Sequence, residues 1–430
     1  MALSGGMDST VLVHALAGPD APAAAPPLRA IHVNHGLHVE AARWAEHCQA
    51  LCDELAVPLT ILNVSVATGH AGGLEAAARA ARYSALGECL QPGECLVTAH
   101  HQEDQLETIL LRLMRGTGID GLAGIAPRRR FAAGWLQRPL LDIPQSELVA
   151  YATRHRLEWV DDPSNANEQA DRNFLRLRVV PLLRQRWPGM AATATRTARI
   201  ARETSTLLAD LAAFDAQQAV SGDVIDLRSF RTLGRSRQLN LVRHLIRERG
   251  LPMPSEVQLR QGAEQLLSAG SDKLPVMRWD AGQLRRYRDC LYLLNADPEQ
   301  AARELPAEYV WQAAGEPLEL GSLRGRLRLE PVAGGGISLP ATSLHVRFRS
   351  GGERIRGAGH AHHARLKKLF QGWGVLPWMR AHVPLIYAGR RLVCVADLMT
   401  AADAAVEGDE PGFRIRWDRH AQHRAPDDRN

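Results

Sequence analysis

The most chemically specific segment of this sequence is a short turn near its start, whose residues suit a phosphate group. Two adjacent glycines, Gly5 and Gly6, allow a tight bend that brings backbone N–H groups against an anion. An apolar helical pattern follows, so a helix beginning at Ser9 would point its N–H donors and positive dipole end at the same place. We predict a nucleotide-phosphate site here; the alternative is a Gly-Ser turn that only caps a helix. The whole turn reads Ser4-Gly5-Gly6-Met7-Asp8-Ser9, with both serines as hydroxyl donors.

Asp8 gives this turn a further property, because a carboxylate repels a bare phosphate. A carboxylate beside phosphate oxygens is typical of a Mg²⁺ ligand that bridges to them. We therefore predict that Asp8 binds the metal. The Walker pattern GxxxxGK[ST] is absent, so the turn is not that of an ordinary phosphate-loop NTPase.

The elements that must position the turn alternate between strands and helices over about the first 120 residues. This alternation predicts a doubly wound parallel α/β sheet. Ligands of such sheets bind beyond the carboxyl ends of the strands, which places the turn, His32 and the segment after Ala99 at one edge. The expected strands are 29–34, 59–65 and 94–99, and the expected helices are 9–16, 39–55, 74–90 and 103–115.

Changes in composition divide the chain into four parts. A long helical pattern follows the first part, and amphipathic helices over 237–249 and 255–267 predict a small helical domain. The glycine run 334–336 indicates a linker, and β-rich runs at 344–348 and 391–395 follow it. The expected boundaries are 1–190 for the α/β domain, 191–214 for a helical connector, 215–300 for the small helical domain and 335–430 for a C-terminal α+β module.

Charge and cysteine usage narrow the class of protein. Six cysteines are scattered without a CxxC pair, and no apolar stretch approaches the roughly 20 residues that cross a bilayer, which predicts a cytoplasmic protein. The net charge is +5, but residues 346–400 carry ten arginines and lysines against Glu353 and Asp397 only. This excess predicts a phosphate-binding surface, where His360-x-His362-His363 would contact phosphate rather than zinc.

Further motifs give the sequence a family resemblance. The turn is similar to the pyrophosphate loop of the PP-loop ATP pyrophosphatases, which split ATP into AMP and pyrophosphate to activate an oxygen. The other motifs, in order and spacing, resemble those of the tRNA(Ile)-lysidine synthases. They are HVNHGL (32–37), LEAAARAARY (74–83), TAHHQEDQLET (98–108), RLMRGTG (112–118), RPLL (138–141), DDPSN (161–165), RNFLR (172–176), GGERIR (351–356) and LKKLF (366–370).

This resemblance implies an adenine nucleotide alpha hydrolase-like fold and a two-step ligation. The 2-oxygen of a wobble cytidine would attack the α-phosphate of ATP, and the lysine ε-amine would then displace AMP to form lysidine. ATP, with Mg²⁺, L-lysine and the isoleucine tRNA with a CAU anticodon are the implied cofactors and partners. The domain at 215–300 and the basic C-terminal module would bind the tRNA. No membrane is implied, and the oligomeric state is left open, with a homodimer among the alternatives.

The resemblance also assigns roles to side chains. Asp104 and Glu107 lie three residues apart on one helix face and would hold the lysine ammonium; the alternative is a solvated acidic face. Arg79 would stabilise charge at the α-phosphate, unless it only pairs with Glu75. The other assignments are Asp8 as a catalytic residue; ATP contacts from Ser4, Gly5, Gly6, Met7, Asp8, Ser9, His32 and Asn34; and substrate contacts from Arg82, Arg112, Arg115, Arg172, Arg176, Arg354, Arg356, Lys367 and Lys368.

Four questions stay open at the level of the sequence. His100 and His101 could contact substrate or pack, and either Asp104 or Glu107 could accept the amine proton. Two other functions are a PP-loop tRNA thiolase, which needs suitable cysteines or a cluster, and a non-catalytic nucleotide- or RNA-binding protein. Only Met1-Ala2-Leu3 precede the turn, which is short for a central strand. We expect a start inside a longer gene, or else a sheet that accepts this short strand.

Overall fold

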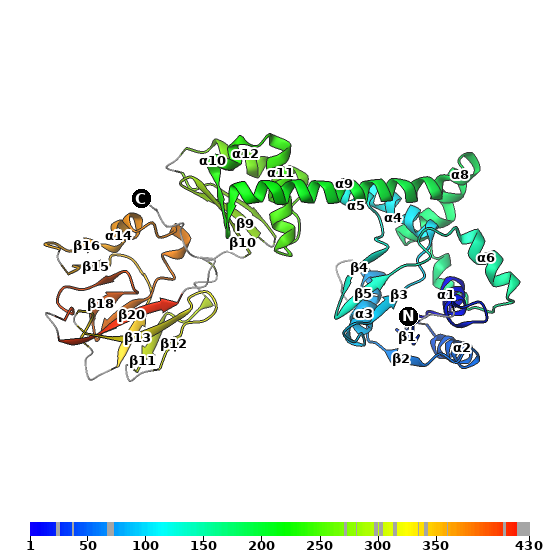
Figure 1. The fold of residues 1–430 in the computed structure, drawn as a ribbon, viewed down its shortest axis with the longest axis horizontal. Helices are drawn as coiled ribbons and strands as arrows, with labels where there is room; N and C mark the ends of the chain where they lie inside the picture. The colour runs from blue at the N-terminus through cyan, green and yellow to red at the C-terminus, as the bar shows by residue number, and fades with distance from the viewer. Residues whose placement is uncertain are drawn as a thin grey trace. The chain divides into compact units, whose positions relative to one another are not determined.

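The computed structural model describes residues 1–22, 26–36, 38–66, 73–270, 273–280, 282–295, 300, 304–312, 316–333, 335–338, 343–358, 360–406 and 410–418. Leu37 of the HVNHGL motif and Gly334 of the expected linker lie outside these residues. The chain divides into two compact units, Met1–Leu208 and Ala209–Asn430, and each is described by itself (Figure 1).

The first unit is built on a largely parallel sheet whose centre is the start of the chain. Ala2 forms a parallel bridge with Ile31, and its N–H donates to the carbonyl of Val97 on the other side. The short strand therefore joins two parallel pairs, β1 with β2 and β3 with β5, while β4 pairs antiparallel with β5 at the edge. The strands are β1 (Ala30–Asn34), β2 (Leu59–Asn63), β3 (Cys95–Val97), β4 (Arg128–Phe131) and β5 (Gly134–Gln137).

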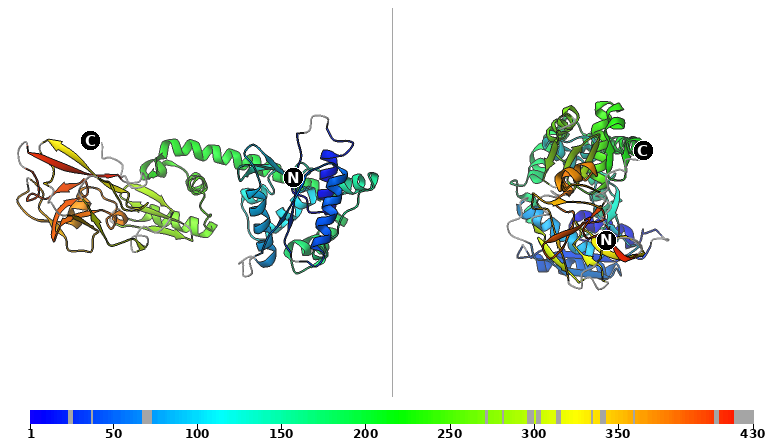
Figure 2. Two further views of the ribbon diagram at one scale, coloured as in Figure 1. Left: turned by 90° about the horizontal axis from the view of Figure 1, so that it is seen from below. Right: turned by 90° about the vertical axis from the view of Figure 1, so that its left-hand side faces the viewer.

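Helices cover both faces of this sheet, because successive strand residues point to opposite sides. Ala30 packs with Leu12 and Cys48 in one apolar core, whereas its neighbour Ile31 packs with Leu86 in another. Burial of each large apolar side chain contributes about 1.5–3 kcal/mol. The predicted doubly wound sheet is confirmed (Figure 2). The main helices are α1 (Met7–Ala17), α2 (Ala41–Glu54), α3 (Gly73–Glu88), α4 (Gln102–Met114) and α6 (Gln145–Arg154).

A helical segment after the sheet carries the RNFLR motif. It begins with α7 (Asp171–Phe174), widens into the π-helix η2 (Leu175–Val179) and continues as α8 (Val180–Arg186). Such π-helical turns often occur at functional sites. The helix predicted over 191–214 is confirmed as α9 (Met190–Ala219), which is longer at both ends.

The first part of the second unit combines helices with a five-stranded antiparallel sheet in the order β6-β7-β10-β9-β8. The two predicted amphipathic helices are confirmed as α11 (Arg235–Glu248) and α12 (Glu256–Ser268). The sequence predicted a small helical domain in this region; its two main helices are present, but the sheet beside them was not predicted. Its strands are β6 (Val220–Ser221), β7 (Val224–Asp226), β8 (Val276–Trp279), β9 (Gly282–Tyr287) and β10 (Cys290–Leu294), with α10 (Leu227–Thr232) beside them.

The C-terminal part is an α+β module, as predicted. One sheet has the order β11-β14-β17-β18-β19, a second has the order β12-β13-β20, and β15 pairs with β16. Fully buried Phe370 of α14 (Leu366–Gly372) packs in the apolar core with Leu385 and Val395. No described helix is long and apolar enough to cross a membrane. The strands are β11 (Glu308–Trp311), β12 (Leu318–Glu319), β13 (Arg326–Ala333), β14 (Leu344–Arg347), β15 (Arg354–Ile355), β16 (Ala364–Arg365), β17 (Leu385–Ala388), β18 (Arg391–Val395), β19 (Met399–Thr400) and β20 (Pro411–Asp418).

Candidate active site

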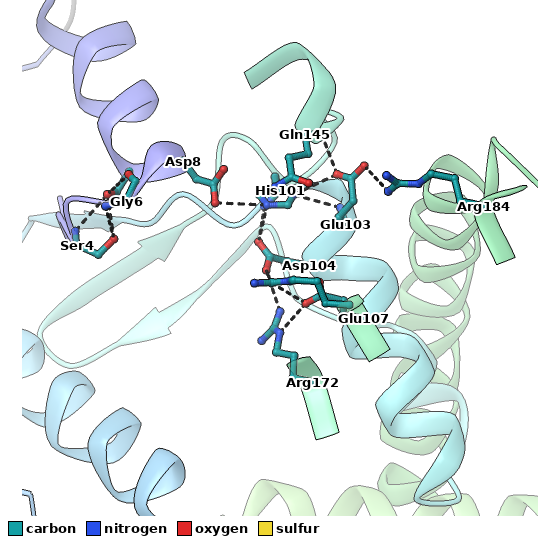
Figure 3. A network of polar contacts seen from close by, with 12 residues as sticks. Ser4, Gly6, Asp8, His101, Glu103, Asp104, Glu107, Gln145, Arg172 and Arg184 are labelled. Carbon is teal, nitrogen blue, oxygen red and sulfur yellow. Dashed lines mark hydrogen bonds and ion pairs between the residues drawn. The ribbon is translucent and has the colours of Figure 1, made fainter. Parts of the chain in front are cut away.

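The turn between the first strand and α1 has the geometry of an anion-binding loop. Gly5 has φ +86°, a conformation that other residues rarely adopt, and a Cβ there would lie 3.1 Å from the Cys48 sulfur. Serine hydroxyls fix the loop from inside: Ser4 Oγ lies 3.0 Å from Ser9 Oγ, which donates to the Gly6 carbonyl at 2.9 Å (Figure 3). The loop is therefore shaped before any ligand binds.

The helix begins two residues earlier than the sequence predicted. We expected a start at Ser9, but α1 begins at Met7 after the extended N-cap residue Gly6. The reason is that the Thr10 N–H donates to the carbonyl of Gly6 at 3.0 Å, which closes the first helical turn at this N-cap residue. The N–H groups of this turn have no acceptor inside the helix and face the loop. Asp8 lies in this first turn.

Replacing Gly5 with alanine is expected to raise the KM for ATP about tenfold or more. The left-handed backbone alone costs a non-glycine residue roughly 1–2 kcal/mol, and the contact with Cys48 forces the loop to move. Gly93→Ala is the matched control, because Gly93 has φ +88° and no described atom lies within 4 Å of the place that its Cβ would take. Steady-state kinetics should show a normal KM for that control; equal effects at both positions would mean that the loop does not bind the nucleotide.

A buried histidine joins the loop to the acids of α4. His101 is the N-cap residue of α4, and its Nε2 lies 3.5 Å from Asp8 Oδ2 and 3.6 Å from Asp104 Oδ2. Its Nδ1 lies 3.2 Å from Glu103 Oε2. Burial alone lowers the pKa of His101, but hydrogen bonds to Asp8 and Glu103 and the charge of Asp104 raise it to about 10. His101 is therefore a cation at neutral pH, held among three carboxylates (Figure 3).

The other oxygen of Asp8 is placed to accept a cation. Asp8 Oδ1 is buried and has no hydrogen-bond partner in the described part of the chain. Among the described residues, no group of three or more His, Cys, Asp or Glu side chains is arranged to hold a metal ion by itself. A single carboxylate suits Mg²⁺, which usually takes one or two protein carboxylates and completes its shell with water and phosphate oxygens. The site therefore fits the predicted ion.

The acid pair of α4 is occupied by arginines of the chain itself. Arg172 donates from Nη2 to Asp104 Oδ1 at 2.9 Å and from Nε to Glu107 Oε2 at 2.7 Å. Arg176 donates to both oxygens of Glu107, at 2.6 and 2.9 Å. Burial lowers the pKa of Arg176, but Glu107 and Asp104 outweigh this and raise it. The RNFLR motif thus lies within the site, where two guanidinium groups neutralise the buried carboxylate of Glu107 and the half-buried one of Asp104 (Figure 3).

A cavity of about 410 Å³ opens beside this ion cluster. Glu103 in its wall accepts from the Gln145 N–H at 2.8 Å and pairs with Arg184 at 3.2 Å. Burial raises the pKa of Glu103, but His101 and the Gln145 N–H lower it further, so the group is ionised at neutral pH. Because positively and negatively charged side chains share one wall of the cavity, a small zwitterion would meet partners for both of its charges there. The cavity is lined by His101, Glu103, Glu107, Gln145, Arg176, Val180, Pro181, Arg184 and Gln185.

A second group of cations lies along α3. Arg79 stacks on the Tyr83 ring, with its guanidinium carbon 5.0 Å from the ring centre. Arg82 donates from Nε to His35 Nε2 at 3.2 Å, and its pKa is lowered by partial desolvation of the guanidinium group and by the nearby charge of Arg79. Both side chains are exposed, and no described carboxylate forms an ion pair with either of them. They remain available to an anion.

Two residues of β1 that were predicted to contact ATP, His32 and Asn34, already have hydrogen-bond partners within the protein. The buried ring of His32 lies with Nδ1 3.0 Å from the Leu3 carbonyl and 3.4 Å from the Cys48 sulfur. Burial lowers the pKa of His32, so the ring is neutral beneath the loop. Asn34 Oδ1 accepts from the Gly36 N–H at 2.8 Å and shapes the following turn. His32 therefore supports the start of the loop, and Asn34 supports the turn after β1.

The predicted substrate arginines of α4 also have protein partners. Arg112 donates to the carbonyls of Gly121 and Gly124, both at 2.9 Å, which pins the segment after α5 (Ile119–Leu122). Arg115 is exposed and pairs with Asp171 at 3.3 Å. In the second unit, the cations of the GGERIR and LKKLF motifs are all exposed: Arg354, Arg356, Lys367 and Lys368. These four residues belong to the second unit, whereas the loop belongs to the first.

Sequence reasoning missed the central position of His101 and the role of Asn173. Asn173 Nδ2 donates to the carbonyls of Ser164 and Asn167, both at 3.0 Å, and so holds the DDPSN segment. That segment reaches the loop, because the Val160 N–H donates to the Gly5 carbonyl at 2.9 Å. Both residues stand inside motifs that the sequence identified, so the motifs were the only available signal.

These features define a class of protein: a doubly wound α/β domain with a preformed anion loop and a metal-competent carboxylate at the sheet edge. Residues 1–183 match the PP-loop domain, residues 225–292 match the TilS substrate binding domain, and residues 344–417 match the TilS substrate C-terminal domain. PP-loop enzymes use ATP, which agrees with this loop.

Relatives over nearly the full chain specify the class further. A tRNA(Ile)-lysidine synthase of Alkalilimnicola ehrlichii is 41% identical and covers 98% of this chain and 93% of its own. The corresponding proteins of Xanthomonas campestris and Escherichia coli O157:H7 are 40% and 38% identical, over 97% and 98% of this chain and 94% and 96% of theirs. The chain belongs to the tRNA(Ile)-lysidine synthase family.

Proposed function

We propose that this chain adenylates the wobble cytidine of the isoleucine tRNA with a CAU anticodon and then replaces the activated oxygen with lysine. The observation that carries the proposal is the preformed Ser4–Ser9 loop, whose Asp8 touches the ion cluster of Asp104 and Glu107 through His101. Nucleotide chemistry and a site for a cationic substrate are thereby adjacent. Family membership supplies the identity of the tRNA and of the amino acid.

In the first step, the cytidine 2-oxygen attacks the α-phosphorus of ATP. An O–P bond forms, the bond to the β-phosphate oxygen breaks, and pyrophosphate leaves. The loop N–H groups would hold the phosphates, and Arg79 would lie near the charge that develops as pyrophosphate leaves. Asp8 would hold Mg²⁺, which supplies charge neutralisation for the phosphates when bound.

In the second step, the lysine ε-nitrogen attacks the ring carbon that carries the adenylated oxygen. A C–N bond forms, the C–O bond breaks, and AMP leaves with the electron pair. The amine must be neutral to attack and loses a further proton afterwards. An amide-like oxygen leaves poorly until adenylation makes it part of AMP, which is why the two steps must share one site.

Asp104 is better placed than Glu107 to hold the lysine ammonium. Both oxygens of Glu107 accept from arginines, whereas Asp104 accepts from Arg172 through Oδ1 and from the His101 N–H through Oδ2. The Glu107 side chain is 3% exposed, against 14% for Asp104. Burial raises the pKa of Asp104, but the charges of His101 and Arg172 lower it below its usual value. Asp104 is thus firmly ionised. A carboxylate of lowered pKa binds an ammonium well and accepts a proton poorly, so its role is to hold the substrate.

The cavity beside the ion cluster would receive the rest of the lysine molecule. Arg184 in its wall suits the α-carboxylate, and Glu103 suits the α-ammonium. The exposed cations of the C-terminal module, with those of the substrate-binding domain, would hold the tRNA backbone.

The test is incubation of the protein with ATP, radiolabelled lysine and isoleucine tRNA transcripts. Lysine should enter the transcript with a CAU anticodon, and a transcript with uridine at the wobble position should remain unlabelled. Equal labelling of both would contradict the assigned base. Sulfur transfer in place of lysine transfer would support a thiolase, which the relatives do not favour.

A further inference from the structure

The edge strand of the first unit carries three consecutive arginines that the mechanism does not use. Arg128, Arg129 and Arg130 of β4 are exposed, and we call them the arginine strip. No described carboxylate contacts any of the three, whereas other arginines of this unit are paired, such as Arg29 with Glu94 at 2.6 Å. Like charges at neighbouring positions repel one another, so this arrangement costs free energy until an anion binds.

An aromatic side chain holds two of these guanidinium groups in place. The guanidinium carbons of Arg128 and Arg130 lie 4.0 and 4.1 Å from the centre of the Trp135 ring. Stacking on indole orients a guanidinium group and leaves its N–H edge free, which suits bidentate contact with phosphate. A preoriented side chain also loses less conformational entropy on binding. Together, the strip and Trp135 form a built cationic surface.

The strip begins at the edge of the sheet where the active site lies. Arg128 pairs with Gln137 at the carboxyl end of β5, and the Gln137 carbonyl accepts from the Thr98 N–H, three residues before His101. Arg129 continues the connection, because its guanidinium carbon lies 5.9 Å from the centre of the Tyr83 ring, on which Arg79 also stacks. Cations therefore extend from the nucleotide site to the outer strand.

We propose that the arginine strip binds the phosphate backbone of the tRNA next to its wobble base. Charge complementarity supports this role: a row of oriented cations, none of them paired with a described carboxylate, continues outward from the site where the base must react. The proposal rests on the proposed function for the identity of the RNA. Contacts of this kind position the substrate and read no sequence, so they should raise affinity without changing which base is modified.

The experiment compares tRNA binding by Arg128→Ala/Arg130→Ala with that by wild-type protein over a range of salt concentrations. The double variant should bind about tenfold more weakly near 0.15 M salt, and the slope of log Kd against log salt should fall by about 1.5, as expected for two lost phosphate contacts. Arg43→Ala/Arg154→Ala is the matched control, because it removes the same charge from exposed positions, one of them already paired with Glu40. Arg128→Lys/Arg130→Lys should keep the slope and weaken binding less.

Two readouts separate this proposal from the proposed function. The double alanine variant should lose kcat/KM for tRNA while the KM for ATP stays unchanged. An unchanged Kd and salt slope, or equal losses in the control variant, would overturn the strip as an RNA site and would indicate a different anionic partner, such as an acidic protein. If wild-type protein binds tRNA with the expected salt dependence but incorporates no lysine, the RNA-binding role of the arginine strip is supported and the proposed lysine chemistry is contradicted.

Discussion

Replacing Asp8 with asparagine is expected to reduce lysine incorporation into tRNA by about a thousandfold, in a protein that still folds. One carboxylate oxygen is buried without a partner among the described residues, and the other faces the imidazolium of His101. Asparagine keeps the shape but removes the charge that would hold Mg²⁺. Loss of a preorganised electrostatic contact typically costs 10²- to 10³-fold in rate, and loss of the metal adds to it. The fold should lose about 0.3–1 kcal/mol from the helix dipole, in addition to the attraction between the Asp8 carboxylate and the imidazolium of His101.

Asp20→Asn is the control for this prediction. Asp20 lies just beyond the other end of α1, is exposed, and pairs only with His155 at 3.5 Å in the described structure. The Asp20→Asn substitution removes the same charge from the same helix region. AMP formation should be measured for both variants with increasing Mg²⁺. A near-normal rate for Asp8→Asn would exclude the metal role and with it the assigned position of ATP.

The second large effect is expected for Asp104→Asn, as a rise of about 100-fold in the KM for lysine with little change in the KM for ATP. The physical reason is the loss of a charged hydrogen bond to the ammonium, worth about 1.5–3 kcal/mol. Glu107 keeps its contacts with Arg172 and Arg176, so the helix cluster should remain intact. The measurement is initial rate against lysine concentration at saturating ATP and tRNA.

Asp171→Asn serves as the control, because it removes an exposed acid that pairs with Arg115 outside the cluster. A normal KM for lysine in Asp104→Asn would show that the ammonium binds elsewhere. Glu107→Gln is a poorer test. It would leave two guanidinium groups without their buried partner, and breaking such a pair costs about 3–5 kcal/mol of stability. A loss of activity there would not separate binding from folding.

The strands and helices that position the loop were predictable because their signals are local. Apolar periodicity locates α2 and α4 to within two residues, and the parallel order of strands follows from their alternation with helices. Prediction from local patterns failed for the five-stranded sheet of the second unit. Strand β9 buries Arg285 and Arg286, and charged residues in a strand hide the apolar pattern that would identify it. Part of what holds them comes from other segments: Arg286 donates to the carbonyls of Leu266 and Ala269, and Arg285 lies over the Trp378 ring.

The sequence predicted which residues form the site better than it predicted how they are arranged. Asp8 was identified by its residue type and its place in the turn, and Asp104 and Glu107 by the family resemblance of their motif; the structure brings all three to one edge of the sheet. The pairing of Glu107 with Arg172, 65 residues away, depends on how α7 packs against α4. No local pattern encodes that contact. The same holds for His101, whose charge depends on carboxylates from two separate helices.

The most direct test of the account uses ATP labelled at the α-phosphorus, with isoleucine tRNA and without lysine. The loop and its neighbouring acids predict that label moves to the tRNA as an adenylated base, and that added lysine releases it as AMP with one lysine incorporated per AMP. Release of ADP, or formation of AMP that does not depend on tRNA, would contradict the account.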